Sequence, residues 1–290
     1  MQSNPLILAI ELICQVNTLG YMTKDSTVNI SELSDIYKMW FDRSGPCDGC
    51  PRRDCSRVLA PLYGYGDLPA DIAIVAQAPG GDKVSDRDGN LIADGRRTWK
   101  NYTDANHSDA AIASRNGFSR DKLETLGNYS DDIKPLVDAL ERVWQRQLNR
   151  SCRIYYTQHT KCDDIHTDSF DPETDDGQDL CSNYLVPELK LIQPDLVLVM
   201  GGKPDKHLQR AMSDLGVKPE LPANVKDIIF SDPDSGSGVQ TYPSSLLDAD
   251  VLPSYHYGYY GMLSMRRYTL FDDDNDYWET LAEKAVDKFM

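Results

Sequence analysis

Cysteines at five positions of this 290-residue chain could bind a metal. Cys47 and Cys50 form a C-x-x-C pair, and Cys55 follows close behind. Cys162 and Cys181 lie far downstream. Four thiolates that converge from two distant segments suit either a structural zinc ion or a four-iron, four-sulfur cluster. Because the chain has seven cysteines, an odd number, and no evident secretion signal, they favour such a site over a disulfide framework.

Three other segments place polar groups where a buried strand is expected to end. Residues 75–80 run from an apolar strand into a proline-glycine turn, whose backbone N–H groups could bind a ligand. Gln158 ends a second strand, four residues before Cys162. His256 lies just past the last strand. Since ligands bind at the carboxyl ends of parallel strands, these groups predict one site.

Apolar periodicity predicts the elements that would position these groups. Strand and helix alternate along the chain, which implies a parallel sheet covered by helices on both faces. The predicted helices cover residues 31–44, 133–148, 181–192, 206–215 and 278–289, and the predicted strands cover residues 71–76, 153–157, 194–202 and 251–253.

The chain is long enough to bury one full core, and we predict one main domain. A helical lead-in at residues 1–44 precedes a domain at residues 45–290, in which the polar residues 82–130 form an insertion or long loop. Translation could start at Met1 or at Met22. No stretch approaches the ~20 apolar residues of a membrane helix, so we expect a soluble cytoplasmic protein.

Taken in order, these signals resemble the iron–sulfur uracil-DNA glycosylases of families four and five. That family has a C-x-x-C pair, a strand ending Gly-Glu-Ala-Pro-Gly, a strand carrying Thr-Asn-Val-Val-Lys-Cys, a cysteine opening the next helix, an apolar strand ending in glycine and a Tyr-His-Pro-Ser loop. The resemblance covers about residues 47–289. The segments of this chain that match these motifs are Cys47 and Cys50, Ala76–Gly80, Thr157–Cys162, Cys181, Pro194–Gly201 and Ser254–Gly258.

The resemblance implies a fold, a cofactor and a partner. The fold is a three-layer α/β/α sandwich with a four-stranded parallel sheet. The cofactor is a 4Fe–4S cluster bound by Cys47, Cys50, Cys162 and Cys181, with zinc as the less favoured occupant and Cys55 as the reserve for Cys50. The partner is DNA with a damaged or deaminated base, bound by a monomer.

The departures from the family pattern lie where the chemistry happens. Ala76 and Gln77 stand where the family has Gly and Glu, and Gln158 stands where it has the Asn that reads uracil. Tyr257 and Gly258 replace Pro-Ser. The aromatic residue that stacks on the base is not placed by the resemblance, and its candidates are Trp99, Tyr102 and Phe118.

Excising a base breaks an N-glycosidic bond while the base departs as an anion, so the site must stabilise negative charge. His256 is the predicted donor to that anion, assisted by turn amides near Gln77 and Ala78. The turn residues Ala78, Pro79 and Gly80 and the amide of Gln158 are the predicted substrate-binding groups, because an amide can pair with the N3–H and O4 edge of uracil. Gln77 can orient water but, unlike Glu, cannot take its proton.

A base that leaves the helix leaves a gap, and the segment after His256 carries candidates to fill it. Met262 and Leu263 are plausible wedges, and Arg266 and Arg267 could contact phosphates. Ordinary packing and surface roles remain open for all four residues.

Three functions follow in order of preference. The first is a DNA glycosylase acting on uracil or another deaminated base. The second is a catalytically altered or inactive superfamily member that binds DNA as an iron–sulfur protein, which the changes at Gln77, Gln158 and Tyr257 favour. The third is a zinc-containing α/β protein unrelated to DNA.

The surface charge is unusual for a DNA-binding protein. The chain has 46 acidic and 30 basic residues, a formal net charge of -16. Such a surface repels DNA unless salt screens it or basic residues group locally. Adaptation to concentrated salt would explain the charge, since dispersed carboxylates hold hydration there, and an ordinary acidic cytosolic protein is the alternative.

We predict that folding and DNA binding persist in molar salt, where a conventional basic DNA-binding protein loses most of its affinity through counterion competition. Circular dichroism and fluorescence anisotropy with labelled DNA over a salt series would measure both. Loss of structure on adding salt would rule out adaptation to concentrated salt.

Overall fold

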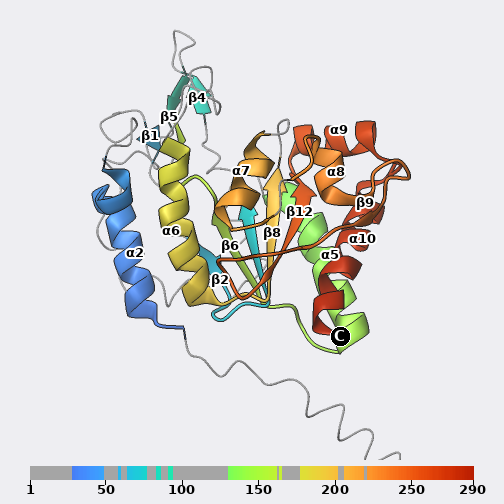
Figure 1. Ribbon diagram of the computed structural model, residues 1–290, viewed down its shortest axis with the longest axis horizontal. Coiled ribbons are helices and arrows are strands. Elements are labelled where there is room, and N and C mark those ends of the chain that lie inside the picture. Colours follow the sequence, from blue (N-terminus) through green and yellow to red (C-terminus); the bar gives the residue numbers. More distant parts are fainter. Residues whose placement is uncertain are drawn as a thin grey trace, which may run out of the picture.

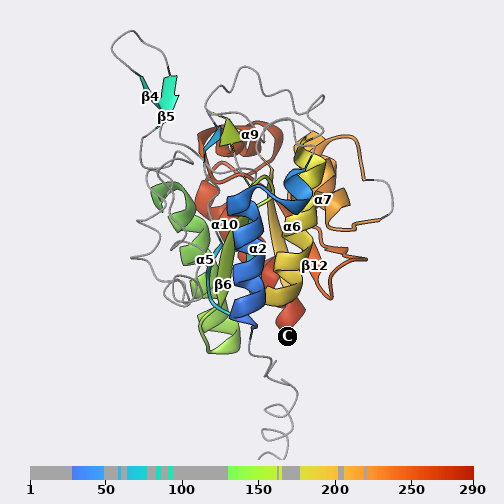
Figure 2. The same ribbon diagram turned by 90° about the vertical axis from the view of Figure 1, so that its left-hand side faces the viewer.

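A mixed β-sheet lies between two layers of helices in the computed structural model of the chain (Figure 1). Helices α2, α6 and α7 cover one face of the sheet, and α5, α9 and α10 lie on the opposite side (Figures 1 and 2). The structure describes residues 28–48, 58–59, 64–76, 83–85, 91–93, 130–161, 163–164, 177–201, 206–218 and 221–290.

The helices alternate with the strands of the main sheet, as the sequence predicts. The α-helices are α2 (Ile30–Asp42), α5 (Ser130–Leu148), α6 (Gly177–Ile192), α7 (Lys206–Asp214), α8 (Val225–Ile229), α9 (Tyr259–Tyr268) and α10 (Asp274–Val286). The 3-10 helices are η1 (Gly45–Cys47) and η6 (Asp287–Phe289). The strands of the main sheet are β2 (Tyr65–Gly66), β3 (Ile72–Ala76), β6 (Ile154–Gln158), β8 (Leu196–Gly201), β11 (Tyr242–Pro243) and β12 (Asp250–Tyr255).

Four parallel strands form the centre of this sheet, which confirms the expected α/β/α fold and its four-stranded parallel core. The strand order is β11-β12-β8-β3-β6-β2, in which β12, β8, β3 and β6 run parallel to one another. The two edge strands, β2 and β11, are antiparallel to their neighbours. Each edge strand has only two residues, which is too short for a periodicity argument to detect.

The central strands are apolar because both of their faces are covered by helices. Every residue of β3 and of β8 is buried. Their sequences, IAIVA and LVLVMG, are continuous apolar runs without alternation. This is the pattern of parallel strands, since an uncovered face would need polar residues at every second position.

The lead-in helix α2 is part of the same core. The Asn29 side chain caps it by accepting hydrogen bonds from the backbone N–H groups of its first turn. Its buried face consists of Leu33, Ile36, Tyr37 and Trp40, which pack in the main hydrophobic cluster. Met39 is 37% exposed and lies outside this buried face. The predicted boundary between residues 44 and 45 stays a prediction.

A buried carboxylate holds the amino ends of β3 and β6 together. Asp71 accepts hydrogen bonds from the guanidinium groups of Arg150 (2.5 Å) and Arg153 (2.7 Å) and from the backbone N–H of Arg153 (2.9 Å). Burial raises the pKa of Asp71, but the hydrogen bonds from Arg153 and Arg150 outweigh it, so the pKa lies below its ordinary value. The two strands are therefore tied at the edge opposite the predicted site.

Two regions contain elements that the sequence analysis did not predict. Within the expected insertion at residues 82–130, the structure describes a short hairpin of β4 (Lys83–Ser85) and β5 (Leu91–Ala93). The carboxyl-terminal third adds α8, α9 and a hairpin of β9 (Phe230–Asp232) and β10 (Ser237–Val239). None of the helices in the described part of the chain is both long and apolar enough to span a membrane.

Candidate functional site

The groups predicted to form the site lie at the carboxyl edge of the parallel sheet. Gln158 is the last residue of β6 and is opposite Ala76, the last residue of β3. His256 directly follows β12, and its backbone N–H donates to Gly201 O at the end of β8 (2.7 Å). Gln77, Ala78, Pro79 and Gly80, the predicted turn, lie outside the described residues.

The hydrogen bonding of His256 determines which of its nitrogens can donate. The backbone N–H of Gly258 donates to Nδ1 of the ring (2.9 Å), so Nδ1 is unprotonated. In the neutral ring the proton then lies on Nε2, which is a donor. Burial lowers the pKa of His256 to about 4, so the ring is neutral at pH 7. No ion pair among the described residues includes this histidine.

The first turn of α9 packs closely on His256. A Cβ at Gly261 would lie 2.0 Å from the His256 carbonyl oxygen and 2.8 Å from its Cβ. Any larger residue at position 261 would therefore push the helix away from the histidine. The His256 backbone is thus held on one side by α9 and on the other by its hydrogen bond to Gly201 of β8.

Gln158 offers a buried acceptor without a partner in the described part of the chain. The residue is 1% exposed, and its Oε1 atom accepts no hydrogen bond from any described residue. A buried polar atom left unpaired costs about 1–3 kcal/mol. Such atoms are rare in folded proteins and indicate a place where a ligand or water donates. The Gln158 amide is therefore suited to bind an N–H group.

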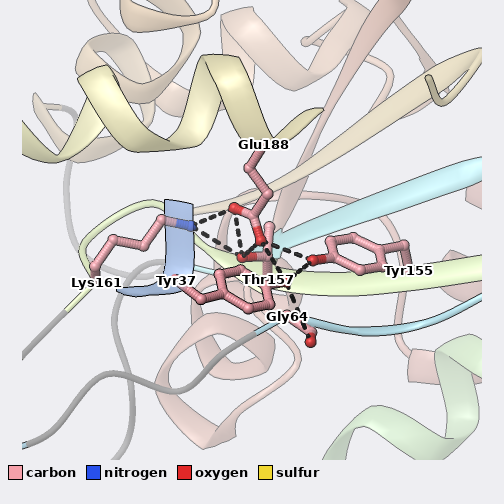
Figure 3. Close-up of polar contacts among 6 residues, drawn as sticks. All are labelled: Tyr37, Gly64, Tyr155, Thr157, Lys161 and Glu188. Atoms are coloured by element: carbon pink, nitrogen blue, oxygen red, sulfur yellow. Dashed lines mark hydrogen bonds and ion pairs between the residues drawn. The ribbon is translucent and has the colours of Figure 1, made fainter. Parts of the chain in front are cut away.

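The opposite face of β6 carries a buried network centred on Glu188 of α6 (Figure 3). Tyr155 and Thr157 donate to the Glu188 carboxylate at 2.7 Å and 3.1 Å. Tyr37 of α2 hydrogen-bonds to the Tyr155 hydroxyl and lies 3.3 Å from Glu188 Oε1. The Lys161 ammonium donates to Glu188 Oε2 (2.7 Å), which makes a fully buried ion pair. One carboxylate thus joins α2, α6 and β6.

Aromatic packing completes the surroundings of the Lys161 charge. The ammonium lies 4.3 Å from the centre of the Trp40 ring, within range for a cation–π interaction. It also donates to the Thr157 hydroxyl at 2.9 Å. Lys161 directly precedes Cys162, one of the predicted metal ligands. The network therefore fixes the chain immediately before that cysteine.

Of the predicted metal ligands, Cys47 is the one whose side chain the structure describes. The Tyr184 hydroxyl lies 3.1 Å from Cys47 Sγ, at hydrogen-bonding distance, and 2.5 Å from Ser44 O. Cys181 lies in α6, three residues before Tyr184, so one turn of the helix separates them. Cys50 and Cys162, like Cys55, lie outside the described residues. Within the residues that are described, no three His, Cys, Asp or Glu side chains group as metal ligands.

Contacts that sequence reasoning missed join residues far apart in the chain. The Tyr257 hydroxyl hydrogen-bonds to the Tyr156 hydroxyl of β6 (2.8 Å). The His159 ring, directly after Gln158, lies 2.7 Å from an Asp214 carboxylate oxygen at the end of α7. The one sequence signal for these roles is the period of two along β6, which puts Tyr156 and Gln158 on one face.

Helix α9 revises the predicted wedge and phosphate contacts. Met262 was a predicted wedge, but it is 7% exposed and belongs to the core, so it cannot enter DNA. Leu263 is 48% exposed and remains available. Arg266 makes two hydrogen bonds to Asp274 (2.8 Å and 2.6 Å), whereas Arg267 is exposed beside the Tyr268 ring. The stacking candidates Trp99, Tyr102 and Phe118 lie outside the described residues.

Comparison with known families agrees with the α/β/α fold described above. The family model of the uracil DNA glycosylase superfamily matches residues 63–281, well over half of the chain. A search of curated proteins finds no match. The matched region contains all six strands of the main sheet, as well as Gln158 and His256.

The buried ion pair generates a stability prediction. Lys161→Met and Glu188→Gln should each lower the free energy of unfolding by about 3–5 kcal/mol, since each leaves a buried charge or polar group without its partner. The double variant should lose less than the sum of the two, because neither charge then remains. Urea denaturation measures all three.

Arg146→Met provides the control for that prediction. Arg146 pairs with Glu279 and Glu283 on the surface, and such pairs contribute about 0–1 kcal/mol. If Lys161→Met cost no more than Arg146→Met, the Lys161–Glu188 pair would not stabilise the site.

Proposed function

The chain belongs to the uracil DNA glycosylase superfamily, and from this premise we propose that it hydrolyses the N-glycosidic bond of uracil or another deaminated base flipped out of DNA. One observation carries the proposal. A neutral histidine, whose Nε2–H has no partner among the described residues, lies at the same edge of the sheet as a buried amide oxygen that likewise has no described partner. These are the groups needed to hold a base and to stabilise it as an anion.

In the proposed reaction, His256 stabilises the leaving base. Its Nε2–H donates to a carbonyl oxygen of the base, on which negative charge grows as the glycosidic bond breaks. Because Gly258 holds Nδ1 as an acceptor, the donor is already oriented before the reaction begins. Loss of such a donor typically costs ~3–4 kcal/mol of barrier height.

Gln158 would select the base. Its Oε1 can accept from N3–H of uracil, and its amide nitrogen can donate to O4. Cytosine presents an acceptor at N3 and a donor at C4, so with the amide held in the orientation that suits uracil it would leave both amide groups unpaired. A bound uracil would also give Gln158 Oε1 a hydrogen-bond donor. Gln is one methylene longer than the Asn of the family, so the base would sit slightly farther from β6.

The predicted turn would complete the substrate site. We expect the turn amides near Gln77 and Ala78 to assist His256, and Ala78, Pro79 and Gly80 to bind the substrate. Gln77 would orient the attacking water without taking its proton. Hydrolysis would then rely on electrostatic stabilisation of the departing base more than on base catalysis.

The exposed surface of α9 supports a role in holding flipped DNA. Leu263 and Arg267 lie four residues apart, so they share one face of the helix. Leu263 would fill the gap that the flipped base leaves, and Arg267 would contact a phosphate. Arg266 would not, because its guanidinium is paired with Asp274.

We propose that Cys47, Cys50, Cys162 and Cys181 bind a 4Fe–4S cluster, with Cys55 as the reserve for Cys50. The hydrogen bond from the Tyr184 hydroxyl to Cys47 Sγ supports this, since hydrogen bonds to the sulfurs tune iron–sulfur sites. A bound cluster would supply a structural link between the segments that carry its ligands. Zinc is the alternative occupant.

A second function is supported by the departures at Gln77, Gln158 and Tyr257. A protein that keeps the fold but lacks the carboxylate of the family motif could bind DNA through the same surface without releasing a base. The two functions differ in one measurable product, the free base.

The cluster proposal predicts the colour and content of the purified protein. Protein purified without oxygen should be brown, absorb broadly near roughly 400 nm through thiolate-to-iron charge transfer, and contain iron and acid-labile sulfide. A colourless protein with one equivalent of zinc would contradict it.

The proposed role of His256 predicts a selective loss of chemistry. His256→Ala should lower the rate of base release by ~100-fold or more, since it removes an oxyanion-type donor. DNA affinity should change little, because phosphate contacts dominate binding. Single-turnover release from uracil-containing oligonucleotides and anisotropy with the same oligonucleotides measure the two effects.

Two further variants test the assignment itself. Gln77→Glu restores a carboxylate that can activate water, and Gln158→Asn restores the amide of the family, so each should maintain or raise base release. If the wild type, both variants and their combination all release no base, DNA binding without catalysis is the preferred function.

A further inference from the structure

The Tyr257 side chain lies against His256 at one end and hydrogen-bonds to another strand at the other. Its ring centre lies 4.3 Å from that of His256, with the two planes 32° apart. Its side chain is buried, and its hydroxyl lies 2.8 Å from the hydroxyl of Tyr156. Tyr156 belongs to β6, whereas Tyr257 follows β12, and two strands, β8 and β3, separate β6 from β12 in the sheet. The tyrosine therefore reaches across the carboxyl edge of the sheet.

We propose that Tyr257 is a positioning residue that holds the His256 ring in place and links it to β6, the strand that presents Gln158. This inference rests on the proposed function, in which His256 acts on the base that Gln158 reads. Proline, which the resembling family has at this place, has neither an aromatic ring to lie against the imidazole nor a hydroxyl to bond to β6.

Two hydrogen bonds with described residues restrain His256, and they leave the tilt of its ring unrestrained. The hydrogen bond to Gly201 O fixes the histidine backbone, and the Gly258 N–H holds Nδ1. Neither contact covers a face of the ring. Tyr257 covers one face, so it limits tilting of the imidazole about the Gly258 hydrogen bond. The Nε2–H direction, on which donation to the base depends, then follows the position of Tyr257.

Tyr156, the partner of Tyr257 in this hydrogen bond, is also held in place. Tyr156 and Gln158 are two residues apart on one strand, so both point to the same face, about 6–7 Å apart along the chain. The Tyr65 ring packs against Tyr156 with ring centres 5.4 Å apart. Burial, together with the neighbouring Tyr156, raises the pKa of Tyr65 well above its ordinary value. Tyr65 and Tyr156 are only 7% and 4% exposed, so water has little access to them. A hydrogen bond between hydroxyls is stronger in such surroundings than in water.

The same contact keeps water from the histidine. Burial is the cause of the low pKa of His256, and no described charged side chain forms an ion pair with the ring. Among the described residues, His256 contacts Gly201 at the end of β8 and Gly258 and Gly261 at the start of α9, and these three glycines have no titratable side chain. Of the described titratable side chains, that of Tyr257 lies against the imidazole, with its ring centre 4.3 Å away. Removing its side chain would admit water and raise the pKa of His256 toward 6.5.

The first test separates the hydroxyl from the ring. Tyr257→Phe and Tyr156→Phe each remove one hydroxyl of the same hydrogen bond. Each should slow single-turnover base release by about tenfold, while the protein concentration that gives half the maximal rate stays within about twofold. The double variant should be no slower than either single variant, because all three lose the same contact. Tyr242→Phe is the control, since the Tyr242 hydroxyl donates to Ile228 O, and Tyr242 of β11 pairs with Val251 at the amino end of β12, away from His256. It should leave base release unchanged.

The second test does not require catalysis. Tyr257→Leu removes the ring, and proton NMR of the His256 imidazole should then show its pKa rise from about 4 toward 6.5. The fold is checked by circular dichroism. If the wild type releases no base, the proposed function fails, yet this titration still decides whether Tyr257 shields His256. An unchanged His256 pKa in Tyr257→Leu, or independent and additive effects of the two Phe variants, would overturn the inference.

Discussion

Strand β6 presents its side chains alternately to the two helical layers, and this alternation divides the site into an anchoring face and a reading face. Tyr155 and Thr157 point to the layer of α6 and bind Glu188. Tyr156 and Gln158 point to the other side, toward the loop that carries His256. A slip of one residue in the register of β6 would exchange the two faces. The buried ion pair and the position of the Gln158 amide therefore depend on the same register.

The anchoring face explains how that register is enforced. Glu188 can be satisfied only if Tyr155, Thr157 and Lys161 all point to α6, and a buried carboxylate without these partners would be strongly destabilising. His159 adds a further contact on this face, to Asp214 of α7. The reading face, by contrast, contains an amide oxygen without a described partner. The Glu188 network on one face of β6 thus holds the strand in place. This fixed strand positions Gln158 Oε1, which has no described partner, on the other face, as a preorganised binding site requires.

Much of the fold could be predicted from sequence, because long apolar strands and amphipathic helices carry a clear period. The predicted helices were located correctly, but three of them begin three or four residues before the predicted start. These are α5 at Ser130, α6 at Gly177 and α10 at Asp274, where the Asp273 side chain caps the helix. Two-residue edge strands carry no period at all. The prediction that Met262 is a wedge was wrong, because its position in the sequence does not show which side of α9 faces the core. The structure buries Met262 and exposes Leu263.

Strand ends predicted Gln158 and His256, but the contacts that orient them join residues about 100 positions apart, such as Tyr156 and Tyr257. No local pattern specifies such a pair.

The most direct test of the account is release of free uracil by the wild-type protein from single- and double-stranded uracil-containing DNA, at low and at molar salt. The account predicts free uracil, with no release from the matching cytosine-containing strand. DNA binding without free uracil under any of these conditions would contradict it.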